Sequence, residues 1–166
     1  MKSSIDEIAA LIYNAPIGKY IGESGAKILA QRAAQKLDLE DDEVLCEKGV
    51  STNSFYIVTK GRFAITTEAR DKQTPAIVHV LEKGDLVGEL SFIDGSAHAE
   101  TVRSLGSSGV VSFNKSDIDP LIQENPDLIF NFMRAVIKRV HGTLTAINRQ
   151  QSELQAYIQT GGRGRL

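Results

Sequence analysis

The stretch GDLVGELSFIDGSAHAETVR, residues 84–103, decides the fold. Glycines at positions 84, 88 and 95 divide it into short runs, and glycine is the residue that best tolerates a sharp chain reversal. The same alternation of short apolar runs and turn residues extends over residues 36–113. It predicts short strands rather than long helices in this part of the chain.

The predicted strands cover residues 44–46, 55–58, 63–67, 77–81, 99–105 and 110–113. Many short strands at this spacing predict a β-sandwich or barrel. Gly61, between Lys60 and Arg62, predicts a tight hairpin, because glycine accepts the positive φ of a two-residue turn. With helices on both sides, the expected fold class is α+β, mainly β.

Helical patterns flank the strands. Residues 3–34 are predicted to be helical, with a break at residues 14–18. After the strands, Asn114 or Ser116 can cap a short helix, and Pro126 suits the first position of the next helix. We therefore divide the chain into an N-terminal helical segment (1–35), a β region (36–113), C-terminal helices (114–160) and a flexible tail (161–166).

The last helix carries a long apolar stripe at helical period. Its members are Met133, Val136, Val140, Leu144, Ile147, Leu154 and Ile158. A helix over residues 126–159 is about 50 Å long, which exceeds what a domain of this size needs for its own core. We expect core packing before Gly142 and, beyond it, a homodimer seam.

Several landmarks, taken in order, resemble one known family. Residues 84–103, with Gly88-Glu89-Leu90, resemble the phosphate-binding cassette of cyclic nucleotide-binding domains. Residues 47–49 and 55–61 resemble the family's first glycine, its Tyr-x-Ile strand and its hairpin glycine, and residues 112–127 resemble the helices of the bacterial catabolite activator type. The resemblance covers about residues 36–158. It implies a β jelly-roll, or double-stranded β-helix sandwich, with N-terminal helices and a long C-terminal helix.

The resemblance also implies a ligand, cAMP or cGMP, and a set of residues around it. Glu89 accepts a hydrogen bond from the ribose hydroxyl, Gly88 and Leu90 bring backbone close to the sugar, and residues 90–93 offer amides to the phosphate. The implied pocket residues are Gly88, Glu89, Leu90, Ser91, His98, Ala99 and Thr143, the last as a contact for the purine base.

The cassette departs from the family pattern at the phosphate. His98 stands where the family has arginine, and Ala99 follows where activator-type proteins often have a hydroxyl. Histidine has a reference pKa of about 6.5 and is mostly uncharged at pH 7. Three interpretations follow: a vestigial site in which His98 pairs with Glu89 or fills space, weak or proton-assisted cyclic nucleotide binding, or a different ligand.

Composition excludes other classes of function. The net charge of −2 gives no support for general nucleic-acid affinity, and the three histidines show no metal-ligand spacing. No nucleophile stands beside a base, so we expect no enzyme activity, no cofactor and no metal. The single cysteine, Cys46, is expected to be a structural thiol, and a reducing cytoplasm is the simplest compartment. No apolar run approaches the roughly 20 residues of a membrane span.

The long helix suggests how a signal leaves the domain. Activator-type regulators carry a DNA-binding unit after this helix, whereas here eight residues follow Ile158. We therefore expect no direct DNA binding and no membrane association, and output through self-association or an unidentified protein partner. Two hypotheses are kept: a regulatory ligand-binding module, and an interaction module that has kept the fold and lost the ligand.

Overall fold

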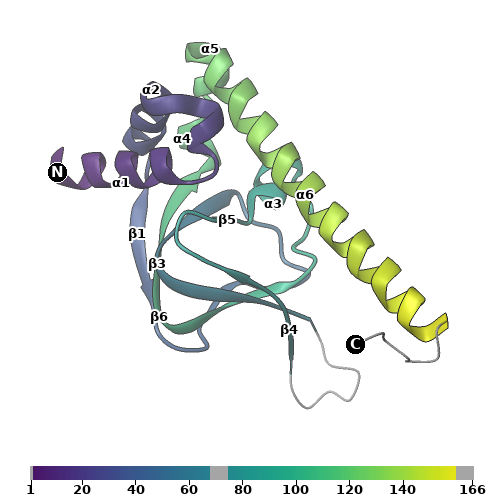
Figure 1. Ribbon diagram of the computed structural model, residues 1–166. Coiled ribbons are helices and arrows are strands. Elements are labelled where there is room, and N and C mark those ends of the chain that lie inside the picture. The colour runs from purple at the N-terminus through teal and green to yellow at the C-terminus, as the bar shows by residue number, and fades with distance from the viewer. Residues whose placement is uncertain (1, 68–74, 160–166) are drawn as a thin grey trace.

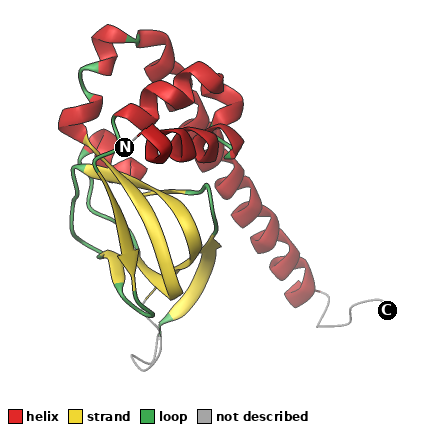
Figure 2. Ribbon diagram, turned by 90° about the vertical axis from the view of Figure 1, so that its left-hand side faces the viewer, coloured by secondary structure: helices red, strands yellow, loops and turns green. Residues whose placement is uncertain are grey.

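Helices gather at one end of a rolled antiparallel sheet, and a long last helix runs away along one side (Figures 1 and 2). The computed structural model describes residues 2–67 and 75–159, so the tail predicted for residues 161–166 lies outside the described residues. The expected α+β class, with an antiparallel sheet and helices before and after the strands, is confirmed, although more of the described residues are helical than in strands.

Among the described residues, six strands form one sheet of order β1-β6-β3-β4, with β2 on β6 and β5 on β3. They are β1 (Gln35–Leu39), β2 (Val44–Cys46), β3 (Ser54–Thr67), β4 (Ala76–Leu81), β5 (Leu86–Val87) and β6 (Thr101–Asn114). All pairs are antiparallel, and β3 pairs with β6 from Ser54, opposite Asn114, to Thr66, opposite Thr101. This β3–β6 pair carries the other strands.

Two strands are longer than the sequence predicts. β3 and β6 each have 14 residues, where the pattern of turn residues predicts two short strands in each place. The hairpin predicted at Gly61 is wrong, because the strand continues through it and Arg62 pairs with Leu105 of β6. Gly61 has a φ of 68°, and a Cβ there would collide with Ser108. The glycine therefore bends a continuous strand instead of ending it.

The helices before the sheet are α1 (Lys2–Asn14) and α2 (Gly18–Gln31), which confirms the predicted break at residues 14–18. α2 kinks at Gly22, where φ is 67°. A short helix, α3 (Glu89–Asp94), lies between β5 and β6, and α4 (Lys115–Ile118), α5 (Leu121–Glu124) and α6 (Pro126–Gln159) follow the sheet. Pro126 begins α6 as expected.

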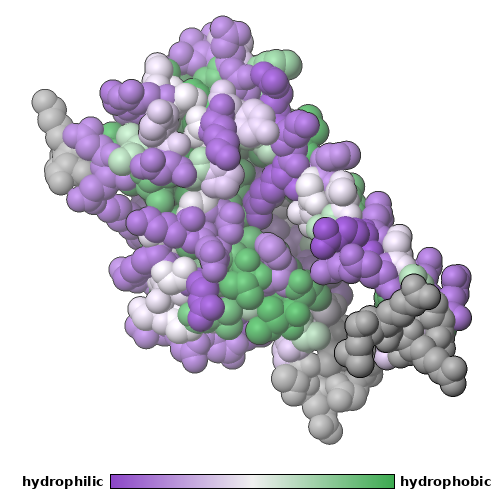
Figure 3. Space-filling view, in the orientation of Figure 1, coloured by the Kyte–Doolittle hydropathy of each residue, from purple (hydrophilic) through white to green (hydrophobic). Residues whose placement is uncertain are grey.

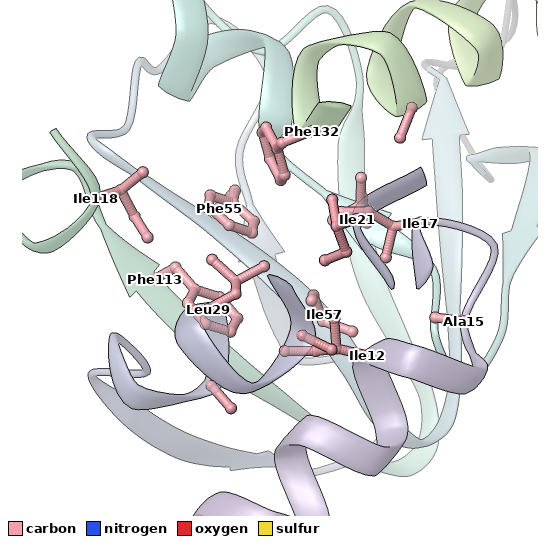
Figure 4. Close-up of a cluster of buried hydrophobic side chains, with 14 of the residues drawn as sticks. Ile12, Ala15, Ile17, Ile21, Leu29, Phe55, Ile57, Phe113, Ile118 and Phe132 are labelled. Carbon is pink, nitrogen blue, oxygen red and sulfur yellow. The ribbon is translucent and has the colours of Figure 1, made fainter. Parts of the chain in front are cut away.

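Phe55 of β3 joins three elements at the centre of the main core (Figure 4). Its ring stacks on Phe113 of β6 at 4.8 Å, meets Phe92 of α3 edge-on at 4.9 Å, and lies 5.2 Å from Phe132 of α6. Aromatic pairs in these arrangements add to the hydrophobic gain of burial. The sheet, α3 and the start of α6 are thereby packed together, which fixes the position of the cassette. A second cluster, around Phe63, fills the inside of the roll.

The first half of α6 packs on the domain with one face, and the second half is exposed. Its 34 residues span about 51 Å. Phe132, Ala135 and Val136 are buried in the main core, and from His141 to the end of the helix the side chains that the structure describes are exposed. The helix continues through Gly142. None of the described helices is both long and apolar enough to span a bilayer.

Candidate functional site

The site begins at Gly88, which turns the chain from β5 into α3. Its φ of 75° is in the left-handed region, which glycine adopts without strain. A Cβ at this position would lie 3.4 Å from Cε1 of His98 and 3.5 Å from the carbonyl oxygen of Ser54. Glycine is therefore favoured here by its positive φ, and the His98 ring lies within van der Waals distance of this turn.

A small polar network holds this ring. Nε2 of His98 lies 3.1 Å from Oγ1 of Thr52, and that hydroxyl also donates to the carbonyl oxygen of Ser54 at 3.2 Å. A hydroxyl has one proton, so it accepts from His98 in this arrangement, and Nε2 carries a hydrogen. The amide of Thr52 donates to Oγ of Ser91 at 2.8 Å, and that hydroxyl donates back to the carbonyl oxygen of Thr52 at 3.2 Å. Ser91 thus ties α3 to the same loop.

The backbone of His98 is fixed by the loop that precedes β3. The amide of Gly49 donates to the carbonyl oxygen of His98, and the amide of His98 donates to the carbonyl oxygen of Val50, both at 2.9 Å. These bonds lock the residue at the expected arginine position from both sides. The main chain at this position is therefore fixed, and the ring is held by the contact of Nε2 with Thr52.

The charge state of His98 differs from that of the arginine it replaces. Burial lowers the pKa of the imidazole below its ordinary value, and the nearby Glu89 charge opposes that shift. Burial is the larger effect, so the ring is uncharged at neutral pH. The structure therefore places a neutral hydrogen-bonding ring, rather than a cation, at the phosphate end of the cassette.

The cation of the site comes from α6. Nη1 of Arg139 donates to Oε1 of Glu89 at 2.9 Å. Only 12% of the Glu89 side chain and 30% of the Arg139 side chain are exposed. Sequence reasoning missed Arg139, although it lies one helical turn before Thr143 and therefore on the same face of α6. It also missed Thr52, for which the sequence carries no comparable signal.

Comparisons with known proteins agree with this geometry. The model of the cyclic nucleotide-binding domain family matches residues 36–125. The chain belongs to this family.

Relatives of the domain occur in larger proteins. The chain is 33% identical over 109 residues to lysophospholipase NTE1 of Cryptococcus neoformans var. neoformans serotype D, which is 64% of this chain and 6% of that protein. Among solved structures, the N-terminal domain of a transcriptional regulator from Streptomyces coelicolor A3(2) matches with a TM-score of 0.69 at 20% identity, over 82% of this chain and 94% of that one. The regulatory subunit of a cAMP-independent protein kinase A from Trypanosoma cruzi, bound to guanosine, matches with a TM-score of 0.66 at 18% identity, over 96% of this chain and 52% of that one.

The cyclic nucleotide-binding domain brings some of the predicted pocket residues together and leaves others outside. Gly88, Ser91 and His98 meet around the Thr52 loop, and Glu89 points to α6. Leu90 is 48% exposed and Ala99 is exposed. Thr143 is exposed, and its hydroxyl donates to the carbonyl oxygen of Arg139 at 3.1 Å.

Cys46 lies beside this site, and its environment keeps it protonated. Burial, together with the Glu89 charge, raises the pKa of the thiol to about 12. A thiol rather than a thiolate is a poor nucleophile and a poor metal ligand. This fits the structural role expected for it. No group of three or more His, Cys, Asp or Glu side chains within residues 2–67 and 75–159 is arranged to hold a metal ion.

The seam predicted along α6 divides in two. Val136 is only 3% exposed and belongs to the main core, against which Met133 and Val140 also pack. The core packing expected for the stripe before Gly142 is therefore confirmed at Val136, which the chain's own core covers and which is not free for a dimer seam. Leu144 and Leu154 are 54% and 59% exposed. The side chain of Ile147 is not among those that the structure describes.

Proposed function

We propose that this domain is a regulatory sensor with a degenerate phosphate site, in which cAMP and cGMP bind weakly or not at all. The observation that carries the proposal is the neutral, Thr52-bound ring of His98 where a phosphate requires a cation. Two charge-assisted hydrogen bonds from an arginine are worth about 1.5–3 kcal/mol each. Their loss corresponds to roughly two to four orders of magnitude in affinity.

A ligand whose ribose hydroxyl takes Oε1 of Glu89 exchanges partners with Arg139. The carboxylate accepts from Arg139 in this state, whereas a bound ribose needs it to accept from a hydroxyl. Because Glu89 is nearly buried, its charge must stay compensated during that exchange. The guanidinium of Arg139 is the cation that the structure places at Glu89. Cyclic nucleotides can therefore bind by this exchange, but with low affinity.

The same exchange offers a route for output. Arg139 lies on α6, seven residues after Phe132, which packs on Phe55 of β3. A ligand that takes Glu89 from Arg139 removes one of the contacts between α6 and the cassette. Ligand binding thereby shifts the equilibrium between orientations of α6. The size of the shift is set by the difference in the ligand's affinity for those orientations.

A nucleoside is the second candidate ligand. The structurally similar kinase regulatory subunit from Trypanosoma cruzi is described as bound to guanosine. A nucleoside offers ribose hydroxyls to Glu89 without a phosphate, so it does not require a cation at position 98. The uncharged state of His98 favours this ligand class over a cyclic nucleotide.

Self-association through α6 is the proposed output. Leu144, Leu154 and Ile158 leave 54–67% of their surface exposed on the second half of the helix. Figure 3 shows a further apolar patch in the region of β4, where Ile77 and Val78 are each 55% exposed. Exposed apolar patches of this kind mark interaction sites. We propose a homodimer in which the second half of α6 packs against a second copy.

Calorimetric titrations test the ligand. We expect no binding or weak binding of cAMP and cGMP at pH 8 and tighter binding at pH 6, because a bound phosphate favours protonation of His98 and proton uptake costs less at lower pH. Guanosine is the matched neutral probe, and Glu89→Gln should abolish binding of any ligand that uses the cassette. Tight cAMP binding at pH 8 would contradict the degenerate site. Absence of binding by all three probes would support the alternative of a ligand-free interaction module.

Light scattering tests the seam. The full chain should be dimeric, and Leu144→Lys with Leu154→Lys should make it monomeric. Ile122→Lys is a control on α5, because Ile122 is 55% exposed and lies away from the stripe. A full chain that is monomeric at all concentrations would overturn the seam.

A further inference from the structure

A cavity of about 610 Å³ lies between α1 and the β-roll, away from the cassette. α1 supplies one wall with Ile8, Ala10 and Leu11, and the turn before β5 supplies Lys83 and Gly84. None of Gly88, Glu89, Ser91 and His98 lines it. In both ribbon views α1 and α2 lie across one end of the strands (Figures 1 and 2). Its volume falls within the range of about 300–1,000 Å³ typical of small-molecule sites.

The wall formed by α1 is apolar at Ile8, Ala10 and Leu11 and polar at Glu7 and Asn14. Ile8 is 6% exposed and belongs to the main core, and Leu11 packs against the same core. Ala10 is exposed on the cavity side, with only a methyl group to fill space. Small and branched apolar side chains along one helix face make a surface suited to a hydrocarbon chain.

The charged groups at the cavity leave an excess of positive charge. Glu7 and Lys36 both line it and face each other at 3.5 Å, so they compensate one another. Lys83 makes no ion pair within the described part of the chain. The neighbouring carboxylate of Asp85 is turned back to the amide of Glu82, at 2.8 Å. Lys83 is therefore the uncompensated cation of the cavity.

We propose that this cavity is a second ligand site, for an anionic amphiphile. The hydrocarbon chain lies against Ile8 and Leu11, and a carboxylate or phosphate head meets the ammonium group of Lys83. The site is independent of the cassette and of its ligand. The helix α1 that lines the site packs on α2, and α2 packs on α6.

Decanoate is the probe, titrated calorimetrically into the full chain, with 1-decanol as the uncharged analogue. We expect saturable binding of decanoate at one site and weaker binding of 1-decanol. Lys83→Gln should weaken decanoate binding about fivefold, the size of an exposed ion pair, and leave 1-decanol unchanged, while Lys83→Arg keeps both affinities. Lys19→Gln, another exposed lysine that does not line the cavity, is the matched control and should change neither.

A cavity-filling variant tests the position. Ala10→Trp should abolish binding of both probes, because the indole takes the place of the hydrocarbon chain. Tyr13→Trp, at an α1 position that is 50% exposed and does not line the cavity, should bind normally. Thermal unfolding of each variant shows that it is folded.

Three outcomes overturn the proposal. They are a wild-type chain without saturable decanoate binding, an Ala10→Trp variant that is folded and binds both probes, and Lys83→Gln without any effect on decanoate. Vesicles of phosphatidylglycerol distinguish the source of the anion. Binding to vesicles in the absence of decanoate binding would make the surface a lipid headgroup contact and would also overturn the cavity site.

Discussion

Arg139 of α6 and Glu89 of α3 form an ion pair at 2.9 Å although 50 residues separate them in the chain. The pair connects the first residue of the cassette helix to the long helix that leaves the domain. It compensates the charge of Glu89 and adds a polar contact to the hydrophobic packing of α6.

Removal of Arg139 should destabilise the domain. Arg139→Gln leaves the nearly buried carboxylate of Glu89 with a weaker partner, which should cost about 1–3 kcal/mol in the free energy of unfolding. Urea denaturation measures it, and Glu89→Gln combined with Arg139→Gln should recover part of the loss. Arg149→Gln, which removes an exposed pair with Glu153, is the control and should cost little. Equal losses for Arg139→Gln and Arg149→Gln would show that the buried pair carries no special weight.

Stability should depend on pH through His98. Burial lowers the pKa of His98 in the folded state below the unfolded value of about 6.5, so the unfolded chain binds the proton more readily. The corresponding stability is complete above about pH 6.5 and is lost as the pH falls through the folded pKa. Between pH 7.5 and pH 5, the wild type should therefore lose more free energy of unfolding than His98→Gln. Parallel curves for the two proteins would contradict the shift.

Restoring arginine should restore phosphate affinity. We expect His98→Arg to bind cAMP about 10- to 100-fold more tightly than the wild type at pH 8, because the guanidinium needs no proton uptake. Guanosine has no phosphate and should show no such gain. If calorimetry finds no gain for cAMP, the rest of the pocket has also diverged.

We expect Ser91 to contribute more to the free energy of unfolding than its small side chain alone would. It is 3% exposed, accepts from the amide of Thr52 and donates to the carbonyl oxygen of the same residue. Ser91→Ala leaves a partly buried amide without its acceptor, and we expect a loss of about 1–3 kcal/mol. Ser96→Ala changes an exposed serine in the same cassette and should cost less than about 0.5 kcal/mol. Thermal unfolding of both variants distinguishes a structural serine from a merely neighbouring one.

Local sequence signals predicted much of the fold. Neighbouring residues in the sequence are enough to predict the break at residues 14–18, the start of α6 at Pro126 and the mainly β middle region. The hairpin at Gly61 failed because a glycine with positive φ also occurs inside a bent strand. Only pairing with Leu105, more than 40 residues away, distinguishes the two.

The apolar stripe of α6 shows a related limit of local patterns. A helical period identifies an apolar face but does not say what covers it. The first part of the face is covered by the chain's own core and the second part is exposed. The division follows from how far α6 extends past the sheet.

The sequence by itself determined the family, the position of the cassette at Gly88 and Glu89, and the replacement of the expected arginine by His98. These three conclusions depend on which residues occur a few positions apart, and the motifs follow one another along the chain in the order expected for the family. Only the tertiary structure decided which groups meet there: Arg139 at Glu89, and Thr52 at His98. Strand register and the rotation of α6 set those contacts, and both are fixed by hydrophobic packing over the whole domain, around Phe55 above all, which no local motif encodes.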